Sequence, residues 1–165
     1  MKKYFCFLSL LLLVVSCTSE DVTSNNKAFQ ALKDNVFWRA QVFQASIEAD
    51  GIFTIEGSLD SDQIRFQIPE PAKKTYVLGV DDDTKAVYKK TYKGQEAEFS
   101  TGTGKGNGEI IITEYNSIDN TISGTFKFTA VNADADAEKQ TIHFSEGVFY
   151  KIPVTAEHSI VAANN

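Results

Sequence analysis

The sequence is poor in the residues that build thiol, disulfide and metal chemistry. Its 165 residues contain two cysteines and two histidines. Cys6 and Cys17 lie near the N-terminus, whereas His143 and His158 have no Cys, His or Asp partner at a spacing typical of metal ligands. The G-x-S-x-G motif of serine hydrolases is missing too. We therefore predict no catalytic residue, no metal site, no cofactor and no enzymatic activity.

Basic residues are in deficit. The 16 Lys and Arg residues are outnumbered by 22 Asp and Glu residues, which gives a formal net charge of -6 at pH 7. Binding to nucleic acid requires a basic surface, and so does electrostatic attraction to anionic lipid, so we predict neither. Apolar residues make up 42% of the chain, and this fraction supports a packed core rather than a disordered chain.

A predominantly apolar run occurs at the N-terminus. The run from Tyr4 to Val15 follows Lys2 and Lys3. It is shorter than the roughly 20 residues that span a bilayer, and its basic flank is typical of a secretory signal peptide. We predict that residues 1–16 are cleaved.

The run ends in Val14-Val15-Ser16-Cys17, which resembles a bacterial lipobox. The resemblance implies that the sulfur of Cys17 carries a diacylglycerol and that Cys17 becomes the new N-terminus. Loss of Lys2 and Lys3 leaves 14 basic and 22 acidic residues, or a charge of -8. The mature chain then has no free thiol and no disulfide. The alternative is an ordinary signal peptide followed by a coincidental cysteine.

The segment 17–26 is polar after Cys17, and we predict that it is a flexible tether. Ser19 is followed by Glu20 and Asp21, which resembles the surface-export signal of Bacteroidetes lipoproteins, although the acidic run has only two members. The resemblance implies an outer-membrane lipoprotein. Display on the cell surface is favoured over the periplasmic face.

Residues 27–161 show repeated period-two alternation of apolar and polar side chains. The clearest case is 121–130, where Ile122, Phe126, Phe128 and Ala130 share one face. We expect no helix beyond one turn, a frayed end at 162–165, and an edge position for Pro153. Candidate strands are 27–33, 36–47, 52–56, 63–68, 75–80, 85–92, 96–100, 108–115, 121–130, 141–144 and 147–154.

These strands predict a single all-β domain, an antiparallel β-sandwich or a partly open barrel of about 8–10 strands. The segments Gly108–Thr113, Thr121–Ala130 and Ile142–Phe149, with Trp38-Arg39-Ala40 upstream, resemble a family of small Bacteroidetes lipoproteins that forms a domain of unknown function. The resemblance implies that the first two segments pair. It implies no activity, since these motifs are strand and turn patterns.

Aromatic side chains are the remaining indication of a binding site. Tyr88 and Tyr92 share parity in a strand rich in lysine, and exposed tyrosines beside lysines stack on sugars or bind peptides. The alternative is that both tyrosines belong to the core while the lysines lie around its edge. Phe37 and Trp38 are consecutive, so one faces the core and the other is an exposed contact or is covered by a loop.

Three other motifs have plainer explanations. The glycine-rich segment Thr101–Gly108 lacks the helix that a phosphate loop requires, so we predict a flexible hairpin loop. Asp81–Asp83 lacks the spacing of a calcium loop, and so does the alternating set Asp134, Asp136 and Glu138. We predict acidic surface turns in both places.

Three hypotheses for function follow. The first is a non-enzymatic binding or scaffold module that presents its loops and sheet faces to glycans, peptides or envelope proteins. The second is a lipocalin-like carrier of a small lipophilic ligand, and the third is a hydrolase with an unseen pair of carboxylates. A filled core argues against the carrier, whereas an open lumen of several hundred Å³ would support it.

Overall fold

The computed structural model describes residues 27–156, and within that range it contains eleven strands and no helix. The prediction of an all-β fold is confirmed. No helix that could cross a bilayer occurs in the described range. The strands are β1 (Ala28–Lys33), β2 (Val36–Arg39), β3 (Val42–Ile47), β4 (Phe53–Leu59), β5 (Asp62–Ile68), β6 (Thr75–Leu78), β7 (Lys85–Lys90), β8 (Ala97–Ser100), β9 (Asn107–Asn116), β10 (Thr121–Asn132) and β11 (Thr141–Ala156).

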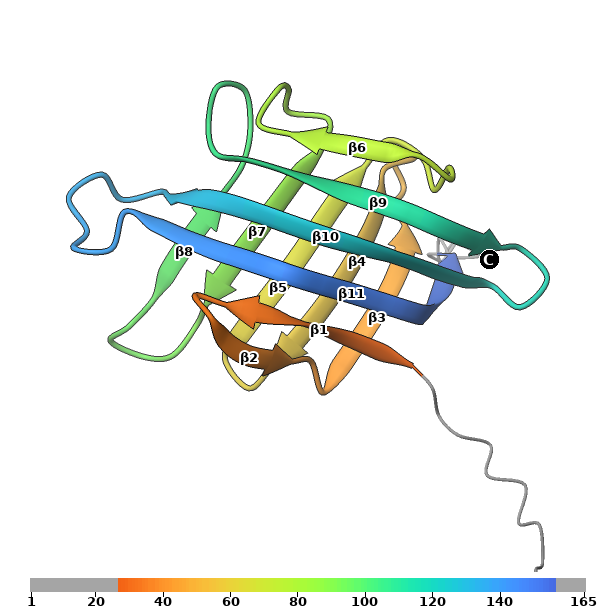
Figure 1. Ribbon diagram of the computed structural model, residues 1–165, viewed down its shortest axis with the longest axis horizontal. Coiled ribbons are helices and arrows are strands. Elements are labelled where there is room, and N and C mark those ends of the chain that lie inside the picture. The colour runs from red at the N-terminus through yellow and green to blue at the C-terminus, as the bar shows by residue number, and fades with distance from the viewer. Residues whose placement is uncertain (1–26, 157–165) are drawn as a thin grey trace, which may run out of the picture.

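The strands form one sheet that closes on itself. Their order is β2-β1-β11-β3-β4-β5-β7-β8-β10-β9-β6, and β10 also pairs with β11. That extra pairing closes the strands from β11 to β10 into a ring, while β1–β2 and β6–β9 extend beyond it. Figure 1 shows the result as two crossing layers, with β9, β10, β11 and β1 in front of β8, β7, β5, β4 and β3. The fold is therefore a flattened barrel with two extensions.

Two details of the strand prediction differ from the structure. The predicted strand 36–47 bends between β2 and β3, whereas 141–144 and 147–154 join into the single long strand β11. The sheet is also mixed, because β11 pairs with β3 in parallel at Val154↔Ala45. The other pairings are antiparallel, including β9 with β10, as the family resemblance implies.

Turn chemistry explains the start of the barrel. β1 and β2 are joined by Asp34 and Asn35, whose φ angles are 48° and 67°. Two-residue hairpin loops favour positive φ at both positions, and Asp and Asn tolerate it better than other side chains. β5 ends at Ile68, directly before Pro69, because proline cannot donate to the ladder.

One edge prediction is wrong, and one loop prediction is met only in part. Pro153 lies in β11, which is not an edge strand; it pairs with Thr121 at the point where β11 leaves β10 and begins to pair with β3. Proline is tolerated at such a junction because the regular ladder is interrupted there. The segment Thr101–Gly108 does not connect two paired strands, since β8 and β9 each pair with β10 and not with each other, but an isolated antiparallel bridge joins Gly102 and Lys105 within it.

The interior of the barrel is filled with aromatic rings. Phe66 is fully buried, and its ring centroid lies 4.7 Å from that of Phe126, 5.9 Å from that of Phe29 and 5.8 Å from that of Phe128. Within residues 27–156, the buried residues of the hydrophobic core extend from Phe29 to Ile152. A chain that begins at Thr18 therefore retains this core.

Candidate functional site

A cavity of about 630 Å³ opens at one end of the barrel. Its apolar floor includes Tyr88 of β7, Phe99 of β8 and Ile142 of β11. Its walls come from the loops 91–96 and 133–139 and from Lys33 at the end of β1. The cavity thus joins segments that are far apart in the chain, and lysine side chains surround an apolar base.

Strand register explains why charged groups ring this opening. Ile64 on β5 pairs with Tyr88 on β7, and both are buried in the core layer. Two residues further along, the inward positions belong to Asp62 and Lys90, which pair with each other across the same two strands. Because side chains alternate with period two, these charged residues share the inward face with the core but lie at its solvent end.

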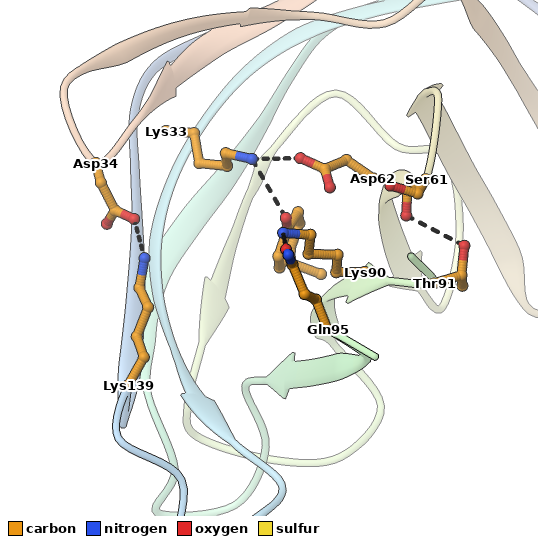
Figure 2. Close-up of polar contacts among 9 residues, drawn as sticks. Lys33, Asp34, Ser61, Asp62, Lys90, Thr91, Gln95 and Lys139 are labelled. Carbon is orange, nitrogen blue, oxygen red and sulfur yellow. Dashed lines mark hydrogen bonds and ion pairs between the residues drawn. The ribbon is translucent and has the colours of Figure 1, made fainter. Parts of the chain in front are cut away.

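Lys33 and Asp62 form an ion pair at the cavity, and Figure 2 shows their side chains meeting. The Lys33 ammonium also donates to the Tyr88 hydroxyl at 3.3 Å and lies 5.2 Å from the centre of that ring. Burial raises the pKa of Tyr88 far above its ordinary value, and the neighbouring Asp62 carboxylate raises it further. Tyr88 therefore remains a neutral phenol throughout the physiological pH range.

A second ion pair joins Asp34 in the β1–β2 turn to Lys139 in the β10–β11 loop, with 2.5 Å between carboxylate and ammonium (Figure 2). The His143 backbone N–H also donates to this carboxylate, at 3.0 Å. Burial by itself would raise the pKa of Asp34, but the bonds from Lys139 and His143 outweigh it, and the pKa lies below its ordinary value. The pair thus links the turn to the loop across the rim of the cavity.

Lys90 differs from the other lysines that line the cavity. Its ammonium donates to the Gln95 side-chain oxygen at 2.7 Å (Figure 2), and no carboxylate of residues 27–156 lies within ion-pair distance of it. Lys89, the preceding residue, is exposed and pairs instead with Glu98 at 3.2 Å. The partner of the Lys90 ammonium at the opening is therefore the neutral side-chain amide of Gln95.

The three aromatic residues singled out from the sequence do not meet at one site. Tyr88 lies on the cavity floor, whereas Tyr92 is 58% exposed in the loop after β7 and does not line the cavity. Trp38 is 2% exposed, and it packs edge-on against Phe29, with ring centroids 5.9 Å apart. Phe37 is the exposed member of the consecutive pair, at 63%. The prediction that Tyr88 and Tyr92 share one face of a strand is wrong, because β7 ends at Lys90.

The remaining candidates are scattered or fall outside the described range. His143 is exposed, and its Nδ1 lies 3.0 Å from the Thr129 hydroxyl. Asp82 pairs with Lys85, and the bond from Lys85 lowers its pKa. Within residues 27–156, no group of three or more potential metal ligands gathers in one place. Cys17, His158, the predicted signal peptide 1–16, the tether 17–26 and the end 162–165 lie outside the described residues.

Sequence reasoning missed the charged ring made by Lys33, Asp62, Lys90 and Lys139. The sequence does indicate two of these residues. Lys90 lies two residues after the inward-facing Tyr88, and Asp62 lies two residues before the inward-facing Ile64, so both also face inward. Charged residues at inward positions near the end of a strand indicate that the barrel is open to solvent at that end. No sequence pattern places Lys33 or Lys139 at this cavity, since their positions depend on how β1 and the β10–β11 loop lie beside β7.

The fold and this site define an all-β protein with a filled barrel and a charged cavity at one end. Its chain belongs to the family described as a domain of unknown function (DUF6252), whose model matches residues 25–153. This match confirms the predicted membership of a family that forms a domain of unknown function. That the protein is a lipoprotein and that it comes from Bacteroidetes stay predictions. Comparison with curated proteins and with solved structures gave no match.

Proposed function

We propose that this protein is a lipid-anchored, non-enzymatic binding module of the bacterial outer membrane, displayed at the cell surface, and that it binds its ligand in the cavity at the end of the barrel. The observation that carries the proposal is the cavity of about 630 Å³, with an apolar floor and a ring of polar side chains. Sites for small ligands have this composition and volumes of roughly 300–1,000 Å³. A glycan unit, a peptide side chain or a small organic molecule fits it.

The filled interior favours binding at the end of the barrel over transport in a central lumen. A lipocalin-like carrier needs an open interior, whereas here the rings of Phe66 and Phe126 lie 4.7 Å apart, and those of Phe128 and Phe144 lie 4.8 Å apart. The cavity begins where this packing ends, at Tyr88 and Phe99.

Two of the carboxylates that pair with lysines at the cavity favour binding over hydrolysis. Asp62 pairs with Lys33, and Asp34 pairs with Lys139. A glycosidase needs a general acid whose pKa is raised so that it holds its proton near neutral pH. The pKa of Asp34 is lowered instead.

The position of β1 supports presentation of the cavity away from the membrane. β1 begins at Ala28 and ends at Lys33, which lines the cavity, so the strand runs toward the opening. Six extended residues span about 20 Å. An anchor at Cys17 would therefore hold the end of the domain that lies opposite the cavity.

The test is a binding screen of the chain beginning at Thr18 against glycans, peptides and lipids. Ala137 lines the cavity, whereas Ala135 is exposed in the same loop and does not line it. We expect Ala137→Phe to abolish binding of any hit by filling the cavity, and the matched control Ala135→Phe to preserve it. Thermal melting verifies that both variants fold. The absence of any hit, or equal binding by the two variants, would refute the proposal.

A further inference from the structure

The cavity holds a cation that is not neutralised by an ion pair. Of the four lysines that line it, Lys33, Lys89 and Lys139 pair with carboxylates, while Lys90 bonds to Gln95. An ammonium has three donors, and the bond to Gln95 uses one of them. Lys90 thus retains donors and a positive charge at the opening.

The acidic groups around the opening have other partners, including Asp62, which lies across from Lys90 on β5 but pairs with Lys33. Glu98 pairs with Lys89 at 3.2 Å, and these two neighbours of Phe99 and Tyr88 have the opposite strand parity. The Glu96 carboxylate accepts the Gly94 backbone N–H at 2.9 Å, and the Asp134 carboxylate accepts the Asp136 backbone N–H at 2.9 Å. These last two side chains are therefore held within their own exposed loops, while Lys90 shares the inward face of β7 with Tyr88.

An apolar surface lies directly next to that charge. Lys90 pairs across the strands with Ala97, and Tyr88 pairs with Phe99, so the inward face passes from charged to aromatic within two residues. The floor is completed by Ile142 and the Tyr88 ring. A ligand that matches this face has an apolar body and one anionic group, separated by a short distance.

We infer that the cavity selects small amphipathic anions, whose apolar body packs against Tyr88, Phe99 and Ile142 and whose carboxylate, sulfonate or phosphate binds Lys90. This inference rests on the proposed function, since it specifies the ligand class of the same cavity. The neutral Tyr88 phenol and the Lys33–Asp62 pair complete the base of the site without repelling such an anion.

Two fluorescent probes test the inference, because they share one ring system and differ in charge. They are 1-anilinonaphthalene-8-sulfonate, an anion, and N-phenyl-1-naphthylamine, its neutral counterpart. In titrations of the chain beginning at Thr18, we expect saturable binding of the sulfonate, tighter than that of the neutral probe. Lys90→Gln should weaken sulfonate binding about tenfold, the loss typical of a hydrogen bond to a charged group, and leave the neutral probe unaffected.

Lys85→Gln is the matched control, because Lys85 lies on the same strand as Lys90, pairs with Asp82 at 3.0 Å and does not line the cavity. It should change neither titration, and melting temperatures confirm that both variants fold. Equal affinity for the two probes, or an unchanged sulfonate affinity in Lys90→Gln, would overturn the selection of anions while leaving cavity binding intact. If neither probe binds, the inferred ligand class is wrong, and the screen with Ala137→Phe and Ala135→Phe decides the proposed function separately.

Discussion

Gly147 on β11 lies directly opposite Phe126 on β10, and the Phe126 ring occupies the space where a side chain at Gly147 would begin. A Cβ atom at Gly147 would lie 2.5 Å from two carbons of that ring. The same ring packs against Phe66 in the centre of the core. This contact therefore joins the seam that closes the barrel to the aromatic interior.

Gly147→Ala should destabilise the protein by about 1–3 kcal/mol, the usual cost of overpacking a buried site. The ring of Phe126 cannot move aside freely, since it is buried among other phenylalanines. Urea unfolding measures the change in the free energy of unfolding. Val148→Ala, at the exposed neighbouring residue, should stay within roughly 0.5 kcal/mol of the unaltered chain. Equal stabilities for the two variants would contradict the proposed close contact.

Phe66→Ala and Phe37→Ala remove the same atoms from opposite environments. Phe66 is fully buried, and its loss should cost about 3–5 kcal/mol because it leaves a cavity in the core. Phe37 is 63% exposed on the edge strand β2, and its loss should cost less than about 1 kcal/mol. Comparing the two unfolding curves measures the difference. A similar loss from both would mean that Phe37 is not exposed in the folded protein.

Asp34→Asn should reduce the acid sensitivity of the fold. Because the folded-state pKa of Asp34 lies below its ordinary value of about 3.9, its ionised form stabilises the native state fully above that pH. The contribution is lost as the pH falls through the folded-state pKa. We expect Asp34→Asn to be less stable at pH 7 by under about 1 kcal/mol, because the pair with Lys139 is partly exposed, and to lose less stability between pH 5 and pH 2.

Asparagine suits this test because it tolerates the φ of 48° at position 34. Asp50→Asn is the control, since Asp50 also lies in an exposed turn and forms no ion pair with residues 27–156. Unfolding is followed at each pH by tryptophan fluorescence. Parallel stability curves for Asp34→Asn and the unaltered chain would show that the Asp34 carboxylate is not bound as described.

Cys17→Ala should abolish metabolic labelling of the protein with a fatty acid, because the thiol of Cys17 is the predicted site of lipid attachment. Cys6→Ala is the control, since Cys6 lies in the segment predicted to be removed, and labelling should continue. Mass spectrometry of the native protein should find a lipidated N-terminus at Cys17. Labelling that persists in Cys17→Ala, or an N-terminus without lipid, would refute the anchor and the location inferred from it.

Much of the secondary structure follows from local patterns. In β10, Ile122, Phe126, Phe128 and Ala130 are all buried, as their shared parity predicts. Asp34-Asn35 forms the turn that its side chains favour. Strand bounds were less predictable, because continuous alternation through 36–47 does not reveal the bend before β3, and the interruption at Ser145–Gly147 is a bulge within β11 rather than a turn.

The candidate site was less accessible to sequence reasoning. The neighbouring lysines single out Tyr88, and it does line the cavity beside Lys90. Tyr92 would share its face only if β7 continued, but the strand ends two residues earlier. Lys33 and Asp62 are 29 residues apart and pair only because β1 lies near the start of β5. No local pattern encodes such a contact.

Alternation and turn residues by themselves predict most of the strands within residues 27–156 and, in a strand without bulges, which side chains share a face, because side chains alternate with period two. The basic flank, the apolar run and the resemblance of Val14–Cys17 to a lipobox carry the prediction of an N-terminal anchor at Cys17. Tertiary structure alone decided that β10 pairs with β11 to close the barrel, that β11 joins β3 in parallel, and that a cavity remains where the aromatic packing ends. The physical reason is that strand partners are chosen by long-range packing of the buried faces, which many local patterns satisfy equally well.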